Sequence, residues 1–401
     1  MAQAAFEFSP LPHPTPAPSG ALPAPAGSAA AHLDRTGFEI GWDHAHHRVN
    51  PPLRHLDHQN PVRQGWAAGR AAFGSRTLKP TAAARQWLAL RLEAWLAGQV
   101  FEGVQVNPAF LARIDADCCP VSRLPLTLCA GRDSDLQFIR LNTAAAYAAG
   151  NLAAVSQRVA LARADKQSSG LHGGDKHGSG PHSGQDNPLS ADEQARLAVL
   201  ASFATPLPHG QAALLPLRLL PPNRVRVINP VQALQVMLTL QFTQAGYARR
   251  LLALAVLMPG SEARQAFQIF MHTLLARRLS AGQAPSALDT RRAMEDSWAD
   301  VLVNRRWQRL ASRLDAAGCE LLLQRAAQRG LVVGGGRWVS PDAATDGWAL
   351  PAPYPANNTA GWGRSPLAGP GQDQAVAGVV LGAGITRPGK TRSFGSQKLV
   401  S

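Results

Sequence analysis

The chain has 401 residues and a formal net charge of +14, and only five of its 40 basic residues are lysines. Glycine (36) and proline (31) are frequent while charged residues make up only 16% of the chain, so we expect a disordered part and two folded domains. The four cysteines form no CxxC pair, which excludes a disulfide framework and a four-thiolate zinc site.

The excess of arginine suits a polyanionic partner. Guanidinium groups bind phosphate bidentately and stack on bases, which favours nucleic acid. A lysine-poor composition rich in arginine and alanine can equally reflect a coding bias, so charge alone leaves this question open. The chain before Arg35 lacks the apolar segment of a secretory signal, and no apolar run is long enough to cross a bilayer. We therefore expect a cytoplasmic protein without membrane contact.

The first part of the chain changes character near residue 36. Residues 1–36 are rich in proline and alanine and are predicted to form a disordered arm. Ordered structure is expected to begin at "FEIGWDHAHH", where Phe38, Ile40 and Trp42 alternate as in a short extended segment. The following "TAAARQWLALRLEAWLAGQVF" predicts a helix with Thr81 as its N-cap and its tryptophans in the core.

A recognisable motif occupies residues 118–163, within "CCPVSRLPLTLCAGRDSDLQFIRLNTAAAYAAGNLAAVSQRVALARA". It resembles a branch of the HNH, or His-Me finger, endonuclease superfamily. The positions that match are Cys119, Pro120, Val121, Ser122, Pro125, Leu126, Thr127, Arg140, Leu141, Asn142, Tyr147, Gly150, Asn151, Leu152, Val155, Ser156 and Arg158. The resemblance implies a ββα finger, and we expect a strand over about 136–142, a helix over about 151–163, and a loop braced by Asn151 between them.

The resemblance also shows which catalytic parts are missing. The family's metal-binding acid falls on Ile139 and its last metal ligand on Ala160, and hydrocarbon side chains cannot bind a hard cation such as magnesium. The family's His-or-Arg position is Arg140, which cannot act as a base because a guanidinium stays protonated. We therefore predict no cofactor, with a divalent metal required only if the protein is a working nuclease.

Three alternatives keep catalysis open. Asp133 and Asp135 could supply carboxylates if the strand register shifts, although a one-residue shift turns every side chain to the other face. Asn142 could supply an amide oxygen. A cluster of histidines could bring ligands from elsewhere in the chain, since histidine is a common metal ligand. Its members are His44, His46, His47, His55 and His58, next to Asp43 and Asp57.

The motif has two non-catalytic interpretations. In the first, the finger binds nucleic acid without cutting it, through Arg140 and Arg158 with Arg123, Arg132 and Arg163 beside them. In the second, the finger is purely structural: Tyr147 packs, Gly150 adopts a positive φ, and Asn151 satisfies the backbone of the loop.

The second half of the chain is predicted to be helical. Residues 166–189 form a Gly/Ser/His linker, and a capping box from Ser190 to Glu193 opens the helical domain of residues 190–340. One long helical segment is expected to run from about 289 to Gly330, and "LVVGGGRWVS" could be a closing hairpin. Residues 341–401 are expected to be a disordered basic tail.

These observations predict an α+β chain that is mainly helical, with an HNH-like domain over residues 37–165 and disordered ends. The predicted function is nucleic-acid binding by a finger that does not cleave. The alternative is a protein-interaction or structural module that binds a protein partner through residues 190–340. A metal-dependent endonuclease with rebuilt ligands is the third hypothesis.

Overall fold

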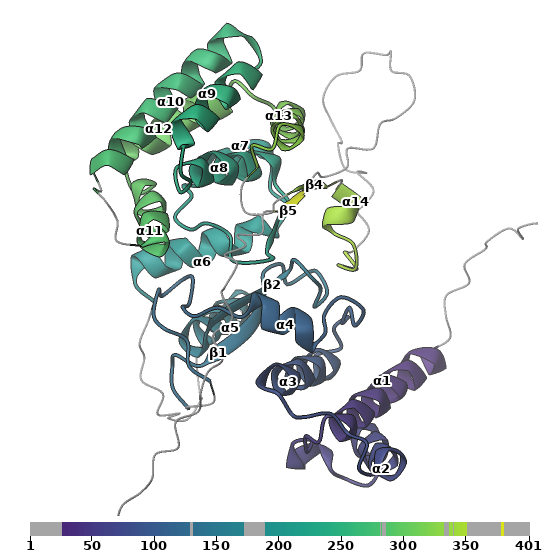
Figure 1. Cartoon of the computed structure of the whole chain (residues 1–401). Coiled ribbons are helices and arrows are strands. Elements are labelled where there is room, and N and C mark those ends of the chain that lie inside the picture. Colours follow the sequence, from purple (N-terminus) through teal and green to yellow (C-terminus); the bar gives the residue numbers. More distant parts are fainter. Residues whose placement is uncertain are drawn as a thin grey trace, which may run out of the picture. The chain divides into compact units, whose positions relative to one another are not determined.

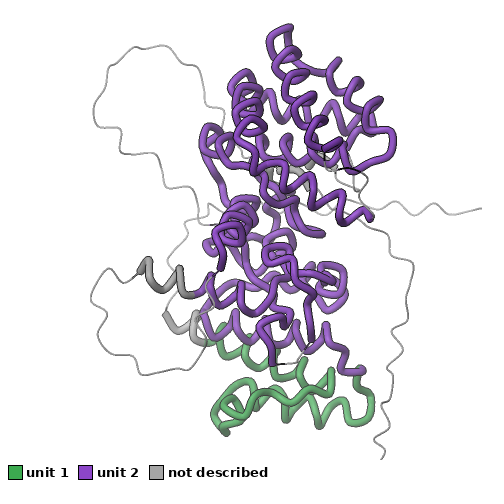
Figure 2. Tube along the Cα trace, turned by 90° about the vertical axis from the view of Figure 1, so that its left-hand side faces the viewer, with its two compact units in different colours: residues 1–78 green, residues 79–401 purple. Residues whose placement is uncertain are grey.

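Two units make up the computed structural model, residues 1–78 and residues 79–401 (Figure 2). The structure describes residues 26–128, 131–171, 189–280, 282, 286–332, 337–339, 341–350 and 378–380. Within this part the chain is mainly helical with little strand, so the predicted α+β class with a predominance of helix is confirmed. Among the described residues, none of the helices combines the length and apolar character that a membrane span needs.

Unit 1 is a pair of helices packed backbone to backbone. Its elements are α1 (Ala26–His46), a 3₁₀ turn η1 (Leu53–His55) and α2 (Pro61–Phe73). Glycines permit the close approach: a Cβ added at Gly41 would lie 1.9 Å from the carbonyl oxygen of Val62, and one at Gly65 would lie 1.9 Å from that of Phe38. Unit 1 therefore depends on small residues where its helices cross.

The expected extended segment at residues 38–42 is wrong, because these residues belong to α1. Phe38 and Trp42 are four residues apart and therefore share one face of a helix, with their rings stacked at 6.3 Å. Three alternating residues are too few to separate a strand from a helix. The predicted arm is also too long, since residues 26–36 are helical; residues 1–25 lie outside the described part of the chain.

Unit 2 begins with helices and a small hairpin. Its first elements are α3 (Ala82–Leu96), α4 (Pro108–Ile114), β1 (Leu136–Arg140), β2 (Leu152–Ser156) and α5 (Gln157–Leu171). Thr81 caps α3 by accepting a hydrogen bond from the amide of Ala84 at 3.1 Å, as predicted. Of the two tryptophans expected in the core, Trp87 is buried but Trp95 is only partly buried. β1 and β2 pair antiparallel, with Leu136 opposite Ser156 and Arg140 opposite Leu152.

The second strand of the finger corrects the predicted boundaries. Residues 152–156 were expected in the helix, but they pair with β1 and are all buried, so the helix begins at Gln157. Alanine favours helices in isolation, yet strand pairing in a buried site overrides that weak preference. Residues 166–171 continue α5 instead of starting the linker, and residues 172–188 lie outside the described residues.

The remaining helices of unit 2 include one largely buried helix against which others pack (Figure 1). They are α6 (Ala191–Phe203), α7 (His209–Leu214), α8 (Pro230–Gln241), α9 (Tyr247–Leu257), α10 (Gly260–Ser280), α11 (Ala287–Ser297), α12 (Val301–Ala311), α13 (Ala316–Gln328) and α14 (Pro341–Ala344). Every residue of α8 from Val231 to Gln241 is buried, and α7, α9 and α13 pack against it. The predicted capping box of Ser190 and Glu193 opens α6.

The long helix expected over residues 289–330 is wrong, because the segment forms three helices, α11, α12 and α13. The breaks fall at Asp300 and Asp315, whose carboxylates cap the next helix by accepting hydrogen bonds from the backbone of Val303 and Gly318, respectively. An aspartate that bonds to nearby amides competes with continuation of a helix. Gly330, with a φ of +65°, follows the end of α13 as predicted.

The last strands also differ from the prediction. β4 (Arg337–Val339) pairs with β5 (Gly378–Val380), and β5 pairs in turn with β3 (Arg226–Val227), so "LVVGGGRWVS" does not form a hairpin with itself within the described residues. Part of the expected disordered tail is ordered: Trp348 is fully buried and donates its indole N–H to the carbonyl of Ala149 at 3.0 Å. Residues 351–377 and 381–401 lie outside the described part.

The units divide the chain differently from the predicted domains. Residues 37–165 were expected to be one domain and 190–340 another. The structure instead places the finger in the same unit as the helices, with a single apolar core that runs from Cys119 and Val159 to Leu200 and Trp348. The chain folds this way because the finger is too small to bury its apolar side chains alone.

Replacing Gly65 with alanine is expected to separate α1 from α2. The added methyl group would meet the carbonyl oxygen of Phe38, a backbone atom that cannot rotate away, so we expect unit 1 to lose about 3 kcal/mol or more of stability. Amide hydrogen exchange of residues 26–78 measures the loss. Gly210→Ala in α7 is the matched control, since no atom lies within 4 Å of its added Cβ. Equal behaviour of the two variants would contradict this account.

Candidate functional site

The loop between β1 and β2 is organised by the side chain of Asn151, which is fully buried. Its amide nitrogen donates to the carbonyls of Asn142 at 3.0 Å and Ala146 at 2.9 Å, and its oxygen accepts from the amide of Asn142 at 2.7 Å. Gly150 precedes it with a φ of +91°, a conformation that favours glycine. The side chain of Asn151 therefore braces the loop, as predicted.

Tyr147 anchors the same loop to the helices before it. Its ring lies 4.5 Å below the guanidinium of Arg140, and its hydroxyl donates to the carboxylate of Glu93 at 3.2 Å. Burial and the negative charge of Glu93 raise the pKa of Tyr147 to about 12. Tyr147 is therefore neutral near pH 7 and packs within the loop.

The two metal-ligand positions of the HNH register are both occupied by packed hydrocarbon. Ile139 pairs with Ala153 across the hairpin, and Ile139 and Ala160 are partly buried against the core of unit 2. Within the described residues, no three histidine, cysteine, aspartate or glutamate side chains come close enough together to hold a metal ion. The predicted histidine cluster lies in unit 1, where His44 and His55 are buried and the ring of His46 stacks on Phe73 at 4.4 Å.

The alternative carboxylate and amide ligands have structural roles. Asp135 is buried, and its carboxylate accepts from the hydroxyl of Thr127 at 2.6 Å and from the amide of Gly131 at 2.8 Å. The side-chain oxygen of Asn142 accepts from the amide of Ala144 at 3.0 Å. Asp133 differs from them, because it is exposed.

Four of the five arginines predicted to contact phosphate bond to protein groups instead. Arg140 donates to the carbonyls of Thr143 and Ala145, and Arg163 donates to the carbonyl of Leu141. Burial, together with the charge of Arg140, lowers the pKa of Arg163. These two side chains hold the finger's own backbone.

The other two arginines, Arg158 and Arg123, join the finger to the helices of unit 2. Arg158 forms an ion pair with Glu193 of α6, and Arg123 bonds to Asp296 at 2.6 Å and Glu295 at 3.4 Å, both in α11. Burial acts to lower the pKa of Arg123, but the hydrogen bonds and charges of Asp296 and Glu295 outweigh it and raise that pKa. Both guanidinium groups therefore have anionic partners within the protein.

One cavity of about 330 Å³ brings predicted site residues together at the base of the finger. Its lining consists of Leu124, Arg132, Asp133, Ser134, Ser156 and Arg158. Arg132 is exposed, and its guanidinium has no hydrogen bond or ion pair among the described residues. Arg132, Asp133 and Arg158 were candidate site residues from the sequence, whereas Ser156 was only a matched position of the motif. Its place in the Ser-x-Arg pair was the available signal.

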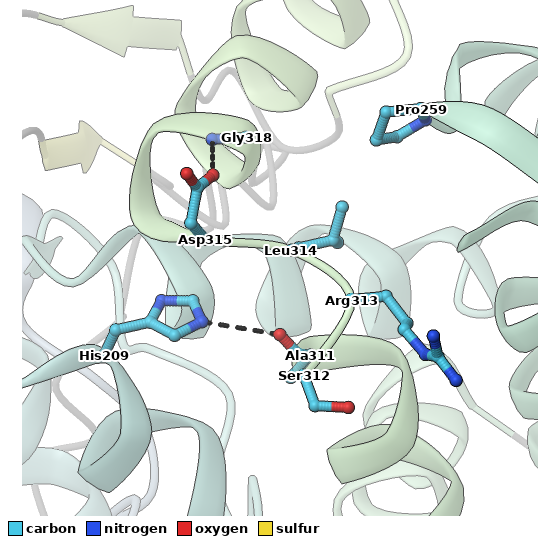
Figure 3. Close-up of a pocket in the computed structure, with 8 residues that line it drawn as sticks. All are labelled: His209, Pro259, Ala311, Ser312, Arg313, Leu314, Asp315 and Gly318. Atoms are coloured by element: carbon cyan, nitrogen blue, oxygen red, sulfur yellow. Dashed lines mark hydrogen bonds between the residues drawn. The ribbon is translucent and has the colours of Figure 1, made fainter. Parts of the chain in front are cut away.

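A larger cavity of about 590 Å³ lies between α7, α12 and α13 (Figure 3). His209 contacts the carbonyl of Ala311 at 3.4 Å, while the carboxylate of Asp315 accepts from the amide of Gly318. Arg313 extends away from His209 and pairs with Glu262. The polar groups of this larger cavity do not converge on a common point. The smaller cavity at the base of the finger is therefore the better candidate for a binding site.

Comparisons with known proteins add no family to these observations. No protein-family model, no curated protein and no solved structure matches the chain. The resemblance to the HNH superfamily therefore stays a prediction that rests on the residues of the motif.

Asn151→Ala tests the role of the brace. The substitution leaves the carbonyl of Ala146 and the amide of Asn142 without these partners and removes one of the two bonds to the carbonyl of Asn142, so we expect a loss of about 3 kcal/mol or more. Denaturant unfolding of the full chain measures it. The control is Asn107→Ala, which removes one cap bond to Phe110 and should cost about 1 kcal/mol. An Asn151 variant no less stable than the control would refute the bracing role.

Proposed function

We propose that this protein binds nucleic acid without cleaving it, mainly through arginines outside the finger. The observation that carries the proposal is a pair of side chains on α12. Arg305 and Arg309 are exposed, lie one turn apart on the face opposite the buried Trp307, and have no hydrogen bond or ion pair among the described residues. Two exposed guanidinium groups at this spacing are suited to bind successive phosphates of a nucleic acid, since a guanidinium binds phosphate bidentately.

The distribution of charge in unit 2 supports the same partner. The carboxylates of Asp192, Glu193, Glu262, Asp296 and Asp300 already pair with arginines of the same unit. The positive excess therefore remains on exposed arginines whose guanidinium groups have no hydrogen bond or ion pair among the described residues. In unit 2 these are Arg85, Arg113, Arg132, Arg224, Arg249, Arg264, Arg305, Arg309, Arg325 and Arg329.

The absence of cleavage is part of the proposal. Metal-assisted phosphodiester hydrolysis needs a cation on the scissile oxygens, and Ile139 and Ala160 offer it no ligand. Asp135 and Asn142 are engaged in the loops, as described above. A reducing compartment such as the cytoplasm also belongs to the proposal, supported by the free thiols of Cys118, Cys119 and Cys319.

We expect the full chain to leave DNA and RNA uncut in the presence of magnesium, manganese, zinc or nickel. Each 1.36 kcal/mol of lost transition-state stabilisation costs about tenfold in rate, so losing the several kcal/mol that a metal supplies abolishes measurable turnover. Gel assays of labelled duplex and single strands check this. Metal-dependent cleavage that disappears in Asp133→Ala would show that the site has been rebuilt around the exposed carboxylate.

Binding is expected to depend on Arg305 and Arg309. The double alanine variant should bind duplex or single-stranded nucleic acid roughly tenfold more weakly at about 0.1 M salt, and the slope of log K against log salt should fall by about two. Fluorescence anisotropy over a salt series gives both quantities. The matched control is the double lysine variant, which keeps both charges and should keep the slope.

An unchanged slope in the double alanine variant would place binding elsewhere on the chain. Both variants retain residues 341–401, so any contribution of that segment is the same in each. Affinity that is independent of salt would exclude phosphate contacts altogether.

A second candidate, a module that binds a protein partner, is favoured by one observation. Leu252 and Val256 of α9 lie one turn apart and are 71% and 66% exposed, which is unusual for large apolar side chains at helical spacing. Binding through this face would tolerate salt, whereas phosphate binding weakens steeply with it. The same salt series therefore separates the two functions.

A further inference from the structure

The cavity of about 330 Å³ at the base of the finger is distinct from the metal position of the HNH register. Ser156, which lines it, pairs with Leu136 at one end of the hairpin, while Ile139 pairs with Ala153 farther along. Three residues of strand correspond to about 10 Å. Any ligand of this cavity is therefore recognised by other side chains than those of a nuclease centre.

Ser156 carries the strongest indication of a ligand. It is 3% exposed, and its hydroxyl has no hydrogen-bond partner among the described residues. The nearby polar groups bond elsewhere and leave this hydroxyl free of a partner among the described residues. The amide of Ser156 donates to the sulfur of Cys119, and the hydroxyl of Ser134 bonds to the hydroxyl of Thr127. A buried hydroxyl without a partner is costly, and such groups in folded proteins are normally satisfied by protein, water or ligand.

The charges around the hydroxyl select the kind of ligand. Among the described residues the guanidinium of Arg132 has no partner, and Arg158 bonds to Glu193 through one terminal nitrogen while its other guanidinium nitrogens make no hydrogen bond. Ser156 also directly precedes α5, whose N-terminal end carries partial positive charge. The amides of Gln157 and Arg158 already donate to the carbonyls of Asp135 and Asp133, so the helix contributes its dipole and not these N–H groups.

The carboxylate of Asp133 limits the negative charge that a ligand of this cavity can carry. The lining contains two guanidinium groups and the carboxylate of Asp133, and Glu193 neutralises part of Arg158. A singly charged oxyanion fits this balance better than a dianion does. A phosphodiester, or a phosphate with one negative charge, also offers acceptor oxygens for a hydroxyl donor and for the fork of an arginine.

We propose that this cavity binds one tetrahedral phosphate group, with the hydroxyl of Ser156 and the guanidinium of Arg132 as its principal donors. Arg158 adds positive charge from its place against Glu193. The proposal does not require the arginines of α12, so it goes beyond the nucleic-acid binding proposed above. The group could belong to a nucleic-acid backbone or to a small phosphate compound, and its recognition is the same in both cases.

Thermal unfolding of the full chain with increasing inorganic phosphate tests the site, against potassium chloride at equal ionic strength. Phosphate is expected to raise the melting temperature near pH 6, where the monoanion predominates over the dianion. Arg132→Ala should weaken this effect about tenfold or more in phosphate concentration, and Arg132→Lys should weaken it less. A nonspecific salt effect would be equal in chloride and would overturn the proposal.

Ser156→Ala separates a ligand site from a merely structural serine. Removing a hydroxyl without a partner should leave the melting temperature without phosphate unchanged or higher, while the response to phosphate falls. The matched control is Ser202→Ala. Ser202 is buried but bonded to Val199 and Gln232, so its loss should lower stability and leave the phosphate response intact. A lowered stability together with an intact response in Ser156→Ala would overturn the proposal.

A final comparison of ligands distinguishes the sources of the phosphate. It also separates the proposed phosphate cavity from the proposed nucleic-acid binding by α12. An oligonucleotide with its 5′ phosphate, the same oligonucleotide without it, and inorganic phosphate are compared as ligands of the Arg132→Ala and Arg305→Ala/Arg309→Ala variants. A phosphate response that survives in the α12 variant supports the cavity even if nucleic-acid binding fails. Oligonucleotide binding that ignores Arg132, with no response to inorganic phosphate, removes the cavity and leaves the proposed function standing.

Discussion

The ion pairs that arginines of the finger make with α6 and α11 are the interactions on which unit 2 depends. Arg158 meets Glu193, and Arg123 meets Glu295 and Asp296. Glu295 has only 5% of its side chain exposed, and it also accepts from the amide of Leu220 at 3.0 Å. A carboxylate so buried needs its partners, because removing one from a buried pair costs about 3–5 kcal/mol. The finger and the helices therefore form one body with a common core.

The same pairing limits what the finger can bind. A phosphate that took Arg123 from Glu295 would leave Arg291 as the remaining cation of that buried carboxylate, and the loss of one partner would oppose binding. Arg140 and Arg163 are similarly engaged, since each holds backbone carbonyls of the finger. Contacts with a polyanion are less costly for arginines that have no partner to lose. We therefore expect a polyanion to contact arginines exposed on the helices in preference to those that already bond within the finger.

Features set by near neighbours were predictable from the sequence, whereas long-range partners were not. The N-cap at Thr81 and the capping box at Ser190 each depend on residues three positions away, and both are present. The strand over 152–156 was missed because its alanines favour a helix unless a partner strand pairs with them. Glu193 could be recognised as a cap, but its bond to Arg158 spans 35 positions of sequence, and no local pattern encodes it. In the candidate site, Arg132 and Arg158 were predicted from the sequence, but the sequence did not indicate that they line the same cavity.

The finger is held together by apolar contacts with the core and by the side chain of Asn151. A bound ion stabilises a small motif by linking a strand to a helix. Here Ile139 of β1 and Ala160 of α5 instead pack against the core of unit 2, and apolar burial is favourable at about 25 cal/mol for each Å². The loop between the strands needs no ion either, because the amide of Asn151 satisfies its backbone. The apolar side chains at these two positions, which cannot bind a cation, are therefore ones that the core can bury.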